Sequence, residues 1–484
     1  MIKLENVSFE YFGRRADSIS DVSLELNKGE CLLLCGRSGS GKTTITKLLN
    51  GLIPNFHEGS MFGRVTVGHL QVNETPMYMI AEVVGSVFQN PRTQFFNVDT
   101  DSEIVFGMEN AGIPADKLKL RLAQTADDLN ISDLLGRNIF ELSGGEKQKI
   151  AFASVYAMNP DVYVLDEPSS NLDAASVNEL KKILKLIKQQ GKTVIVAEHR
   201  LYYLLDIADK VICMNNGRVD KVISPTELRR FPADVRSRMG LRAADLSAVT
   251  PLNAGKIDSE PVIEIRNVSV SHKKKVILKG LNLQVGRGEI IAVAGRNGAG
   301  KTTFSRALCG LHKEYTGEFL QNGKSQSAKA RLKNSYMVMQ DVNYQLFAES
   351  VESECSFGIR NVQMEKVDIA LERLNLTPYR HCHPNTLSGG QKQRTAVAVG
   401  VVSEKEVMIF DEPTSGLDSD SMFQVSELIR MLSEEGRIVF VVTHDFEFVC
   451  ACCTRVLHFS GGTMADDINV TAENTEKLRE LFLA

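Results

Sequence analysis

One glycine-rich pattern that ends in Lys-Thr occurs twice in the chain. GRSGSGKT spans Gly36–Thr43 and GRNGAGKT spans Gly295–Thr302, and both fit G-x-x-x-x-G-K-[ST]. Each copy follows a short apolar run and opens a segment of helical pattern, so backbone N–H groups and a helix N-terminus can converge on phosphate. The pattern predicts two phosphate-binding loops in which Lys42 and Lys301 reach the β- and γ-phosphates of a nucleotide.

A pair of acidic residues ends an apolar run in each half of the chain. Asp166 and Asp411 end VYVLD and VMIFD, where a carboxylate is costly unless it meets a cation. Glu167 and Glu412 follow directly, and we expect them to polarise an attacking water. The predicted Mg²⁺ ligands are Thr43, Gln89 and Asp166 in the first half, and Thr302, Gln340 and Asp411 in the second.

The similarity between the two halves extends well beyond these motifs. MIKLENVSFEY returns as PVIEIRNVSVSH, LSGGEKQK as LSGGQKQR, and VIVAEHR as IVFVVTHD. The segment 143–199 matches 388–444 at a constant separation of 245 residues. Continuous apolar runs alternate with helical segments, a pattern typical of a mostly parallel sheet in an α/β domain. We therefore predict a tandem pair of α/β domains at 1–225 and 261–484, joined by a linker at 226–260.

The composition is that of an ordinary globular protein. The 484 residues are 43% hydrophobic and 24% charged, and a net charge of −4 gives no indication of nucleic-acid binding. No apolar stretch approaches the ~18 residues that a membrane span needs, and the N-terminus has no signal-peptide core. The nine cysteines are expected to be reduced core thiols. The runs HCHP (381–384) and CACC (450–453) do not have the spacing of a tetrahedral metal site.

Each half resembles an ATP-binding-cassette (ABC) ATPase. The most specific sign is the signature, LSGGEKQK or LSGGQKQR, whose Ser143 and Ser388 lie 23 residues before Asp166 and Asp411. The resemblance implies two tandem P-loop ABC nucleotide-binding domains with ATP and Mg²⁺ as cofactors. Each domain would have a mostly parallel sheet core, an antiparallel β subdomain and a helical subdomain. The two cassettes would pair head to tail within the chain, and the signature of each would close over ATP held by the other.

The resemblance also assigns the residues of two composite sites. The ATP-binding residues would be Tyr11, Gly36, Gly39, Gly41, Lys42, Thr43 and Thr44 with Ser388, Gly389 and Gly390 in one site, and Gly295, Gly298, Gly300, Lys301, Thr302 and Thr303 with Ser143, Gly144 and Gly145 in the other. The catalytic residues would be Glu167, Gln89 and His199, and Glu412, Gln340 and His444. Tyr11 resembles the aromatic residue that stacks on adenine, and His272 replaces it in the second half. We therefore expect two active but unequal sites.

Several classes of ABC protein have tandem cassettes without membrane spans. The segment 226–260 is too short and too weakly charged for the helical arm of translation factors, and no cysteine before Cys31 matches the iron–sulfur region of the ribosome-recycling relative. The motif spacings leave no room for the zinc modules or coiled coils of repair ATPases. An importer ATPase is therefore favoured. A sugar-type tandem importer ATPase and a cytosolic tandem ABC protein that acts on the ribosome are the alternatives.

The loop that follows each candidate catalytic glutamine points to one type of importer. VFQNPRTQFFNVDTDSEIVFG resembles the ATPases of energy-coupling-factor (ECF) transporters, and the second copy, MQDVNYQLFAESVESECSFG, lacks only the Asn-Pro of this pattern. The resemblance implies uptake of a vitamin or metal ion through an integral membrane coupling subunit and a substrate-binding membrane subunit. It implies a cytoplasmic protein, peripheral on the inner face of the cell membrane through these subunits, with no nucleic-acid partner. Phe95, Phe96, Leu346 and Phe347 are predicted to offer apolar surface to a partner, with a place in the core as the alternative.

Overall fold

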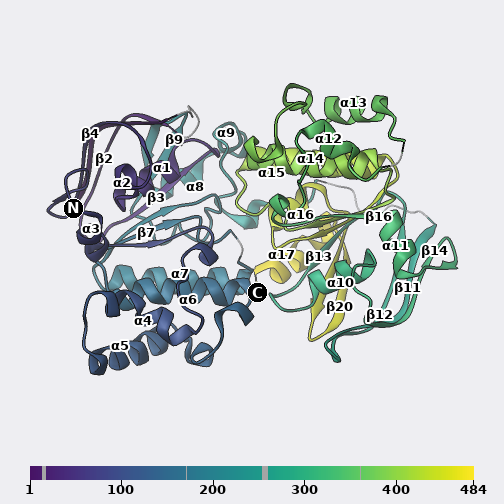
Figure 1. The fold of residues 1–484 in the computed structure, drawn as a ribbon, viewed down its shortest axis with the longest axis horizontal. Coiled ribbons are helices and arrows are strands. Elements are labelled where there is room, and N and C mark those ends of the chain that lie inside the picture. The colour runs from purple at the N-terminus through teal and green to yellow at the C-terminus, as the bar shows by residue number, and fades with distance from the viewer. Residues whose placement is uncertain (13–17, 171, 253–259, 360, 484) are drawn as a thin grey trace. The chain divides into compact units, whose positions relative to one another are not determined.

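The computed structural model describes residues 1–12, 18–170, 172–252, 260–359 and 361–483. They form two units, Met1–Leu246 with Gly416–Asp420, and Ser247–Ser415 with Ser421–Ala484 (Figure 1). The division after Leu246 falls inside the segment predicted as a linker. Among the described residues, no helix has both the length and the apolar character that crossing a membrane requires.

The first unit is built on a six-stranded sheet of order β10-β9-β3-β8-β7-β6. Its strands are β3 (Cys31–Gly36), β6 (Val84–Val87), β7 (Val162–Asp166), β8 (Thr193–Ala197), β9 (Lys210–Asn215) and β10 (Arg218–Ile223). All neighbours pair in parallel except β10, which runs antiparallel to β9 at the edge. Every residue of β3 and β8 is buried, which is the reason for their continuous apolar sequences.

The first unit also contains a four-stranded antiparallel sheet of order β2-β1-β4-β5. Its strands are β1 (Ile2–Tyr11), β2 (Ile19–Leu26), β4 (Gly59–Val67) and β5 (Leu70–Gln71). Buried residues alternate with exposed ones along β2, as expected of a sheet with one face on a core. Ile45 of α1 (Lys42–Leu49) shares a core cluster with Leu4 of β1 and Leu34 of β3, so this helix packs against both sheets.

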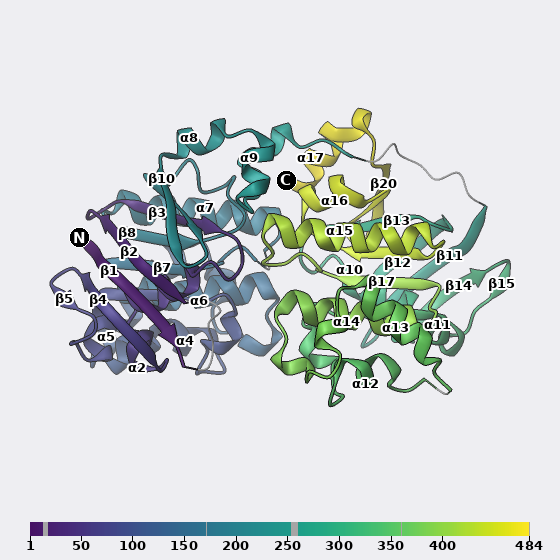
Figure 2. The same cartoon turned by 90° about the horizontal axis from the view of Figure 1, so that it is seen from above.

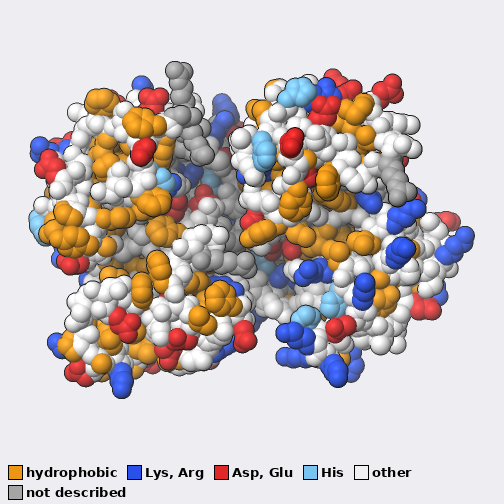
Figure 3. All heavy atoms as spheres, in the orientation of Figure 1, with side chains coloured by type: hydrophobic (Ala, Val, Ile, Leu, Met, Phe, Trp, Pro, Cys, Tyr) orange, Lys and Arg blue, Asp and Glu red, His pale blue; other side chains and the backbone are white. Residues whose placement is uncertain are grey.

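Helices complete the first unit. α4 (Thr100–Asn110), α5 (Ala115–Asp128) and α6 (Gly144–Met158) pack on one another in a helical part of the unit (Figure 1). The other helices are α2 (Leu52–Asn55), α3 (Met77–Val83), α7 (Ala174–Gln189), α8 (Pro225–Arg230) and α9 (Ala233–Arg238). Leu228 of α8, together with Leu241 and Ala244, belongs to the core of this unit. Hydrophobic side chains also gather on the surface over α3 (Figure 3).

The second unit repeats this plan, with sheets of order β16-β17-β18-β13-β19-β20 and β12-β11-β14-β15. The strands are β11 (Pro261–His272), β12 (Lys275–Gly286), β13 (Ile290–Ala294), β14 (Tyr315–Gln321), β15 (Lys324–Ser325), β16 (Ser335–Val338), β17 (Val407–Asp411), β18 (Ile438–Val442), β19 (Arg455–Ser460) and β20 (Thr463–Asn469). The helices are α10 (Lys301–Leu308), α11 (Ala328–Asn334), α12 (Val351–Ser356), α13 (Met364–Arg373), α14 (Gly389–Val402), α15 (Ser419–Glu434), α16 (Phe446–Cys452) and α17 (Thr475–Leu483). Helices α12, α13 and α14 lie together (Figure 2). Both units are therefore α/β with antiparallel and helical parts, as predicted.

The cysteines are free thiols, and all are buried except the half-buried Cys382. Within the described ranges, no group of three or more His, Cys, Asp or Glu side chains is arranged to hold a metal ion.

Candidate functional site

The two glycine-rich loops make a sharp turn from a strand into a helix. Gly36 at the end of β3 has φ of 137°, and a Cβ atom there would lie 2.2 Å from the carbonyl oxygen of Met214. Gly295 has φ of 140°, and its Cβ would lie 2.3 Å from the carbonyl oxygen of Phe459. Only glycine fits such a close approach to the neighbouring strand. Each loop then opens directly into α1 or α10, whose first N–H groups are available to phosphate.

The lysine of each loop is buried and folded over its own loop. Lys42 Nζ donates hydrogen bonds to the carbonyl oxygens of Gly36 (3.0 Å) and Arg37 (2.9 Å). Lys301 Nζ donates to those of Gly295 (2.7 Å) and Arg296 (3.0 Å). Burial lowers the pKa of Lys42. In both units the acceptors of the ammonium group are neutral carbonyl oxygens of the loop. A phosphate oxygen held by the same loop could replace them and accept a stronger, charge-assisted hydrogen bond from the lysine.

A threonine and an aspartate meet beside each loop. Thr43 Oγ1 donates to Asp166 Oδ1 at 3.2 Å, and Thr302 Oγ1 donates to Asp411 Oδ2 at 3.4 Å. Burial, followed by the nearby charge of Glu167, raises the pKa of Asp166 to about 6, and burial also raises the pKa of Asp411. In each unit the threonine hydroxyl and the aspartate carboxylate, which is costly to ionise, provide two oxygen ligands. Such oxygen ligands fit Mg²⁺, whose other ligands are usually waters and phosphate oxygens. The residues present therefore fit the predicted cation.

Each candidate catalytic glutamate lies against a histidine. Glu167 Oε1 is 3.4 Å from His199 Nε2, and Glu412 Oε1 is 3.2 Å from His444 Nε2. In the first unit, Gln89 Nε2 also donates to Glu167 Oε2 at 2.6 Å. Gln340 follows β16 at the position that Gln89 has after β6. The structure thus brings together the predicted glutamine, glutamate and histidine of the first unit, and the glutamate and histidine of the second.

Both glutamates have a backbone conformation that is uncommon for a side-chain-bearing residue. The φ angle is 45° at Glu167 and 50° at Glu412, in the left-handed region. Their N–H groups still donate to the carbonyl oxygens of Ala197 (2.8 Å) and Val442 (2.9 Å) in the neighbouring strand. This geometry turns each carboxylate away from its strand toward the histidine, at a cost of order 1–3 kcal/mol.

Glu198 is a site residue that the sequence did not single out. Its buried carboxylate accepts hydrogen bonds from the N–H groups of His199 (2.7 Å) and Ser169 (3.2 Å) and from the Tyr203 hydroxyl (2.9 Å). In the second unit, Asp445 accepts from Thr414 Oγ1 at 2.9 Å instead. The signal that could have found Glu198 is an acidic residue at the end of the apolar run VIVAE. Glu198 therefore fixes the backbone of His199 and of the loop after Glu167.

The signature serine begins a helix in both units. Ser143 caps α6 and Ser388 caps α14, each through a capping box with the third residue of the helix. A Cβ atom added to Gly144, Gly389 or Gly390 would meet no atom within 4 Å. The first turn of each helix is therefore open enough to present N–H groups to a phosphate.

The aromatic position near the first phosphate loop differs between the units. The Tyr11 hydroxyl lies 3.3 Å from Thr44 Oγ1, and the Tyr11 ring is edge-on to His57, with 5.9 Å between ring centroids. In the second unit, His272 and His312 form the corresponding pair, 6.1 Å apart. The sequence predicted Tyr11 and His272 but not His57 or His312, because their position depends on how the antiparallel sheet folds back on the helix.

The loop after Gln89 is held by a second glutamine and a glutamate. Gln94 Oε1 accepts from the N–H group of Phe88 (3.4 Å), and Glu103 Oε2 accepts from those of Phe96 (3.0 Å) and Asn97 (2.8 Å). In the second unit, Gln345 and Glu354 make the same contacts, the latter with the N–H groups of Phe347 and Ala348.

Only half of the predicted apolar surface of these loops is exposed. Phe96 is 75% exposed and Phe347 is 70% exposed, as predicted. The prediction was wrong for Leu346, which is 4% exposed, whereas Phe95 is partly buried against the core of the first unit. A place in the core, the stated alternative for these residues, therefore holds for Leu346 and in part for Phe95.

Comparisons with known proteins show the family to which the chain belongs. A family model described as ABC transporter matches residues 19–170 and 278–415. The chain is 47% identical over 477 residues to a putative ABC transporter ATP-binding protein of Treponema denticola, and the match covers 97% of each chain.

Two solved structures were matched to the chain, and the first of them resembles it in fold. The model of ribosome-bound archaeal Pelota and ABCE1 contains a chain that matches 98% of this one with a TM-score of 0.69 and 21% identity, and 80% of that chain is covered. The structure of cbiO1 from Clostridium perfringens, part of the ABC transporter complex cbiONQ, matches 49% of this chain and 93% of that chain, with a TM-score of 0.43 and 27% identity. On the family model and the full-length relative, the chain is a tandem ATP-binding protein of the ABC transporter family, whose members bind and hydrolyse ATP.

Proposed function

We propose that this chain is the ATPase subunit of an ABC importer of the ECF type. ATP and Mg²⁺ bound at two composite sites drive uptake of a vitamin or metal ion through separate membrane subunits. The observation that carries the proposal is the loop that begins at Gln89 and its copy at Gln340. Each loop begins with a candidate catalytic glutamine, of which Gln89 donates to Glu167, and contains an exposed phenylalanine, Phe96 or Phe347.

The first step of the proposed mechanism is phosphate binding. The glycine-rich loop holds the β- and γ-phosphates with backbone N–H groups, and Lys42 or Lys301 exchanges its carbonyl partners for phosphate oxygens. Asp166 with Thr43, or Asp411 with Thr302, would hold Mg²⁺, which would neutralise phosphate charge. Signature residues 143–145 and 388–390 supply the other half of each composite site, since their helices begin with open, capped first turns.

The second step is hydrolysis. Glu167 or Glu412 accepts a proton from the attacking water, and His199 or His444 is close enough to hold the carboxylate in position. The fixed left-handed backbone of each glutamate favours one orientation of its carboxylate. The same two histidines are the groups that contact the γ-phosphate in this proposal.

The third step is coupling to a membrane partner. Gln89 bonds directly to Glu167, and the same loop leads through the pinned Gln94 to Phe96, which stacks on Phe106 of α4 with 5.0 Å between ring centroids. A partner that contacts Phe96 can therefore displace Gln89 relative to Glu167. The stacked rings of Phe96 and Phe106 offer apolar surface that a partner could bury.

Purification from native membranes tests this proposal. The full chain and a Phe96→Ser/Phe347→Ser variant are captured, and the integral proteins bound to each are identified. Two small multi-span proteins should accompany the wild-type chain and be depleted at least tenfold with the variant. The control is Phe62→Ser, which changes a 69% exposed phenylalanine on β4 and should leave the partners bound.

The other outcomes distinguish the alternatives. A pair of large permease subunits would favour the sugar-type importer, and recovery of ribosomal proteins would favour the ribosome-acting class. Recovery of the chain alone from the soluble fraction would contradict any transport role.

A further inference from the structure

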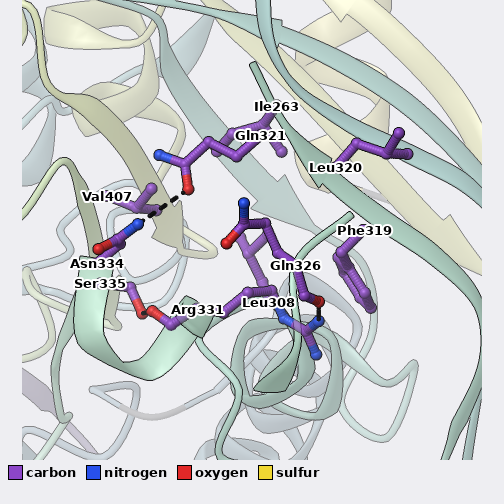
Figure 4. Close-up of a pocket in the computed structure, with 10 residues that line it drawn as sticks. All are labelled: Ile263, Leu308, Phe319, Leu320, Gln321, Gln326, Arg331, Asn334, Ser335 and Val407. Carbon is purple, nitrogen blue, oxygen red and sulfur yellow. Dashed lines mark hydrogen bonds between the residues drawn. The ribbon is translucent and has the colours of Figure 1, made fainter. Parts of the chain in front are cut away.

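The second unit contains a cavity away from its phosphate loop, between β11, β14, α10 and α11 (Figure 4). The cavity, here called the inner part, has a volume of ≈ 20 Å³, and a neighbouring pocket of ≈ 390 Å³, here called the outer pocket, shares lining residues with it. Gln321, Gln326 and Asn334 line both parts. The carboxamide of Gln326 points toward the middle of the group, between Gln321 and Ser335 (Figure 4). Because a buried water needs only ~10–15 Å³, the inner part has room for one small polar group.

The first unit has an apolar core at the same place. Strand pairing shows which residues of the two units are equivalent. Val67 pairs with Ile2 of β1, and Gln321 pairs with Ile263 at the matching position of β11. The N–H group of Val72 donates to Val65 as that of Gln326 donates to Phe319. Ile80 and Val84 precede Gln89 by the same distances that separate Arg331 and Ser335 from Gln340. Val67, Val72, Ile80 and Val84 are all buried in one hydrophobic core.

Four core positions thus change from aliphatic to polar between two copies of one fold. The polar set is Gln321, Gln326, Arg331 and Ser335. Burying polar groups in place of aliphatic ones costs free energy unless each finds a partner. The first unit builds the same fold with aliphatic residues at these positions, so the fold itself does not require the four polar residues and a binding role can account for them.

Arg331 supplies a buried positive charge with an unused donor. The residue is 6% exposed, and its guanidinium lies over the rings of Phe319 (3.9 Å) and Tyr315 (4.8 Å). Its Nε donates to the carbonyl oxygen of Ala307 (3.2 Å), and its Nη1 donates to that of Gln326 (2.8 Å). Buried Nη2 has no hydrogen-bond partner among the described residues. Since buried donors normally have acceptors, Nη2 is a donor that a bound acceptor, such as an anion, could satisfy.

The charges at the rim of the outer pocket also favour an anion. The two carboxylates at the rim are engaged, Glu404 with Lys366 and Glu406 with Gln321 and Arg287. Lys324 and Lys333 have no carboxylate partner in the part of the chain that the structure describes. Lysine and arginine side chains gather on the surface over α11 and β14 (Figure 3).

We propose that this cavity binds a small carboxylate. One carboxylate oxygen accepts from Arg331 Nη2 in the inner part, and the rest of the molecule lies in the outer pocket beside Gln326 and the two lysines. The inner part has room for about one water-sized group, such as a single carboxylate oxygen.

Thermal unfolding of the full chain tests the proposal. Sodium acetate is compared with sodium chloride at equal ionic strength, without nucleotide. Acetate in several-fold excess over its dissociation constant should raise the unfolding temperature of the second unit by about 2–5 °C more than chloride does. The variant Arg331→Ile/Gln326→Val, which installs the first-unit residues Ile80 and Val72, should abolish this difference.

Three further variants keep the result interpretable. Lys329→Gln removes an exposed charge of α11 outside the pocket and should retain the acetate effect, as should Lys301→Ala in the phosphate loop. If the double variant does not fold, Gln326→Val alone should reduce the effect. An equal shift with chloride, an effect that survives the double variant, or its loss in Lys301→Ala would overturn the proposal.

Discussion

His199 Nε2 lies 3.4 Å from Glu167 Oε1, and the same pair recurs in the second unit, where His444 Nε2 lies 3.2 Å from Glu412 Oε1. In both units the glutamate has a left-handed backbone and keeps its N–H group bonded to the neighbouring strand. A strained conformation persists only where the surrounding structure supports it, and such conformations cluster at functional sites. The two units therefore share one arrangement of the residues that we propose to carry out hydrolysis.

The buried aspartate predicts a pH-dependent cost in stability. The pKa of Asp166 is raised from its usual 3.8 to about 6 when the protein folds. At a pH where the Asp166 carboxylate is ionised in the unfolded chain, folding therefore costs additional free energy. The penalty is absent below pH 3.8, grows between pH 3.8 and 6, and is complete above pH 6, at about 3 kcal/mol or less. Asp166→Asn should therefore stabilise the nucleotide-free first unit at pH 7, as measured by urea unfolding.

The same variant should lose that advantage in acid. Well below pH 3.8 its free energy of unfolding should approach that of the wild type, and at pH 7 it should no longer respond to MgATP. A wild-type chain that is more stable than Asp166→Asn at pH 7 without nucleotide would contradict the assigned cause.

The aromatic difference predicts unequal nucleotide affinity. Replacing His272 by Tyr gives the second unit the residue of the first, and an aromatic stacking contact of ~0.5–1.5 kcal/mol should tighten ATP binding about 2–10-fold. Equilibrium dialysis in a Lys42→Ala background would report on the second unit alone. The reciprocal change Tyr11→His, in a Lys301→Ala background, should weaken binding. The four chains compared are Lys42→Ala, Lys42→Ala/His272→Tyr, Lys301→Ala and Lys301→Ala/Tyr11→His. Equal affinities of all four for ATP would refute the proposal that residues 11 and 272 contact the base.

Burial predicts that almost all thiols are unreactive in the native protein. Burial raises the pKa of the Cys31, Cys355 and Cys450 thiols to about 12, so they contain little thiolate at pH 8. Iodoacetamide should label the half-buried Cys382 first, and mass spectrometry after a short pulse should locate the label there. Comparable labelling of Cys31 in folded protein would contradict the predicted packing.

The second glutamine of each loop is predicted to be structural. Gln94 bonds to the backbone of Phe88, Ser86 and Ala151, so Gln94→Ala should speed amide hydrogen exchange over 88–98 by about tenfold. The matching loop at 339–348, held by Gln345, serves as an internal control and should exchange at its usual rate. Unchanged exchange at 88–98 would show that the loop is held by other contacts.

Much of the site follows from local sequence. The turn at Gly36 is dictated by a close approach that only glycine permits, and the capping box at Ser143 lies within four residues. Apolar runs such as that of β3 identify buried parallel strands because both faces of the strand are covered. Such features depend on neighbours in the chain, so a single sequence shows them.

Features that depend on distant residues were not predictable in the same way. Phe95 and Phe96 are identical in type, and only the packing of α4 and the core decides which one is exposed. The role of Glu198 depends on Ser169 and Tyr203, which approach it only in the folded unit. The polar cavity at Arg331 becomes visible only when strand pairing aligns it with the aliphatic core of the first unit.

Hydrolysis by the double variant Glu167→Gln/Glu412→Gln tests the central claim most directly. Steady-state phosphate release should fall at least 100-fold, because both proposed bases are removed, while ATP binding measured by dialysis should stay within about threefold of wild type. Retention of more than a tenth of the wild-type rate by the double variant would show that neither glutamate is the base.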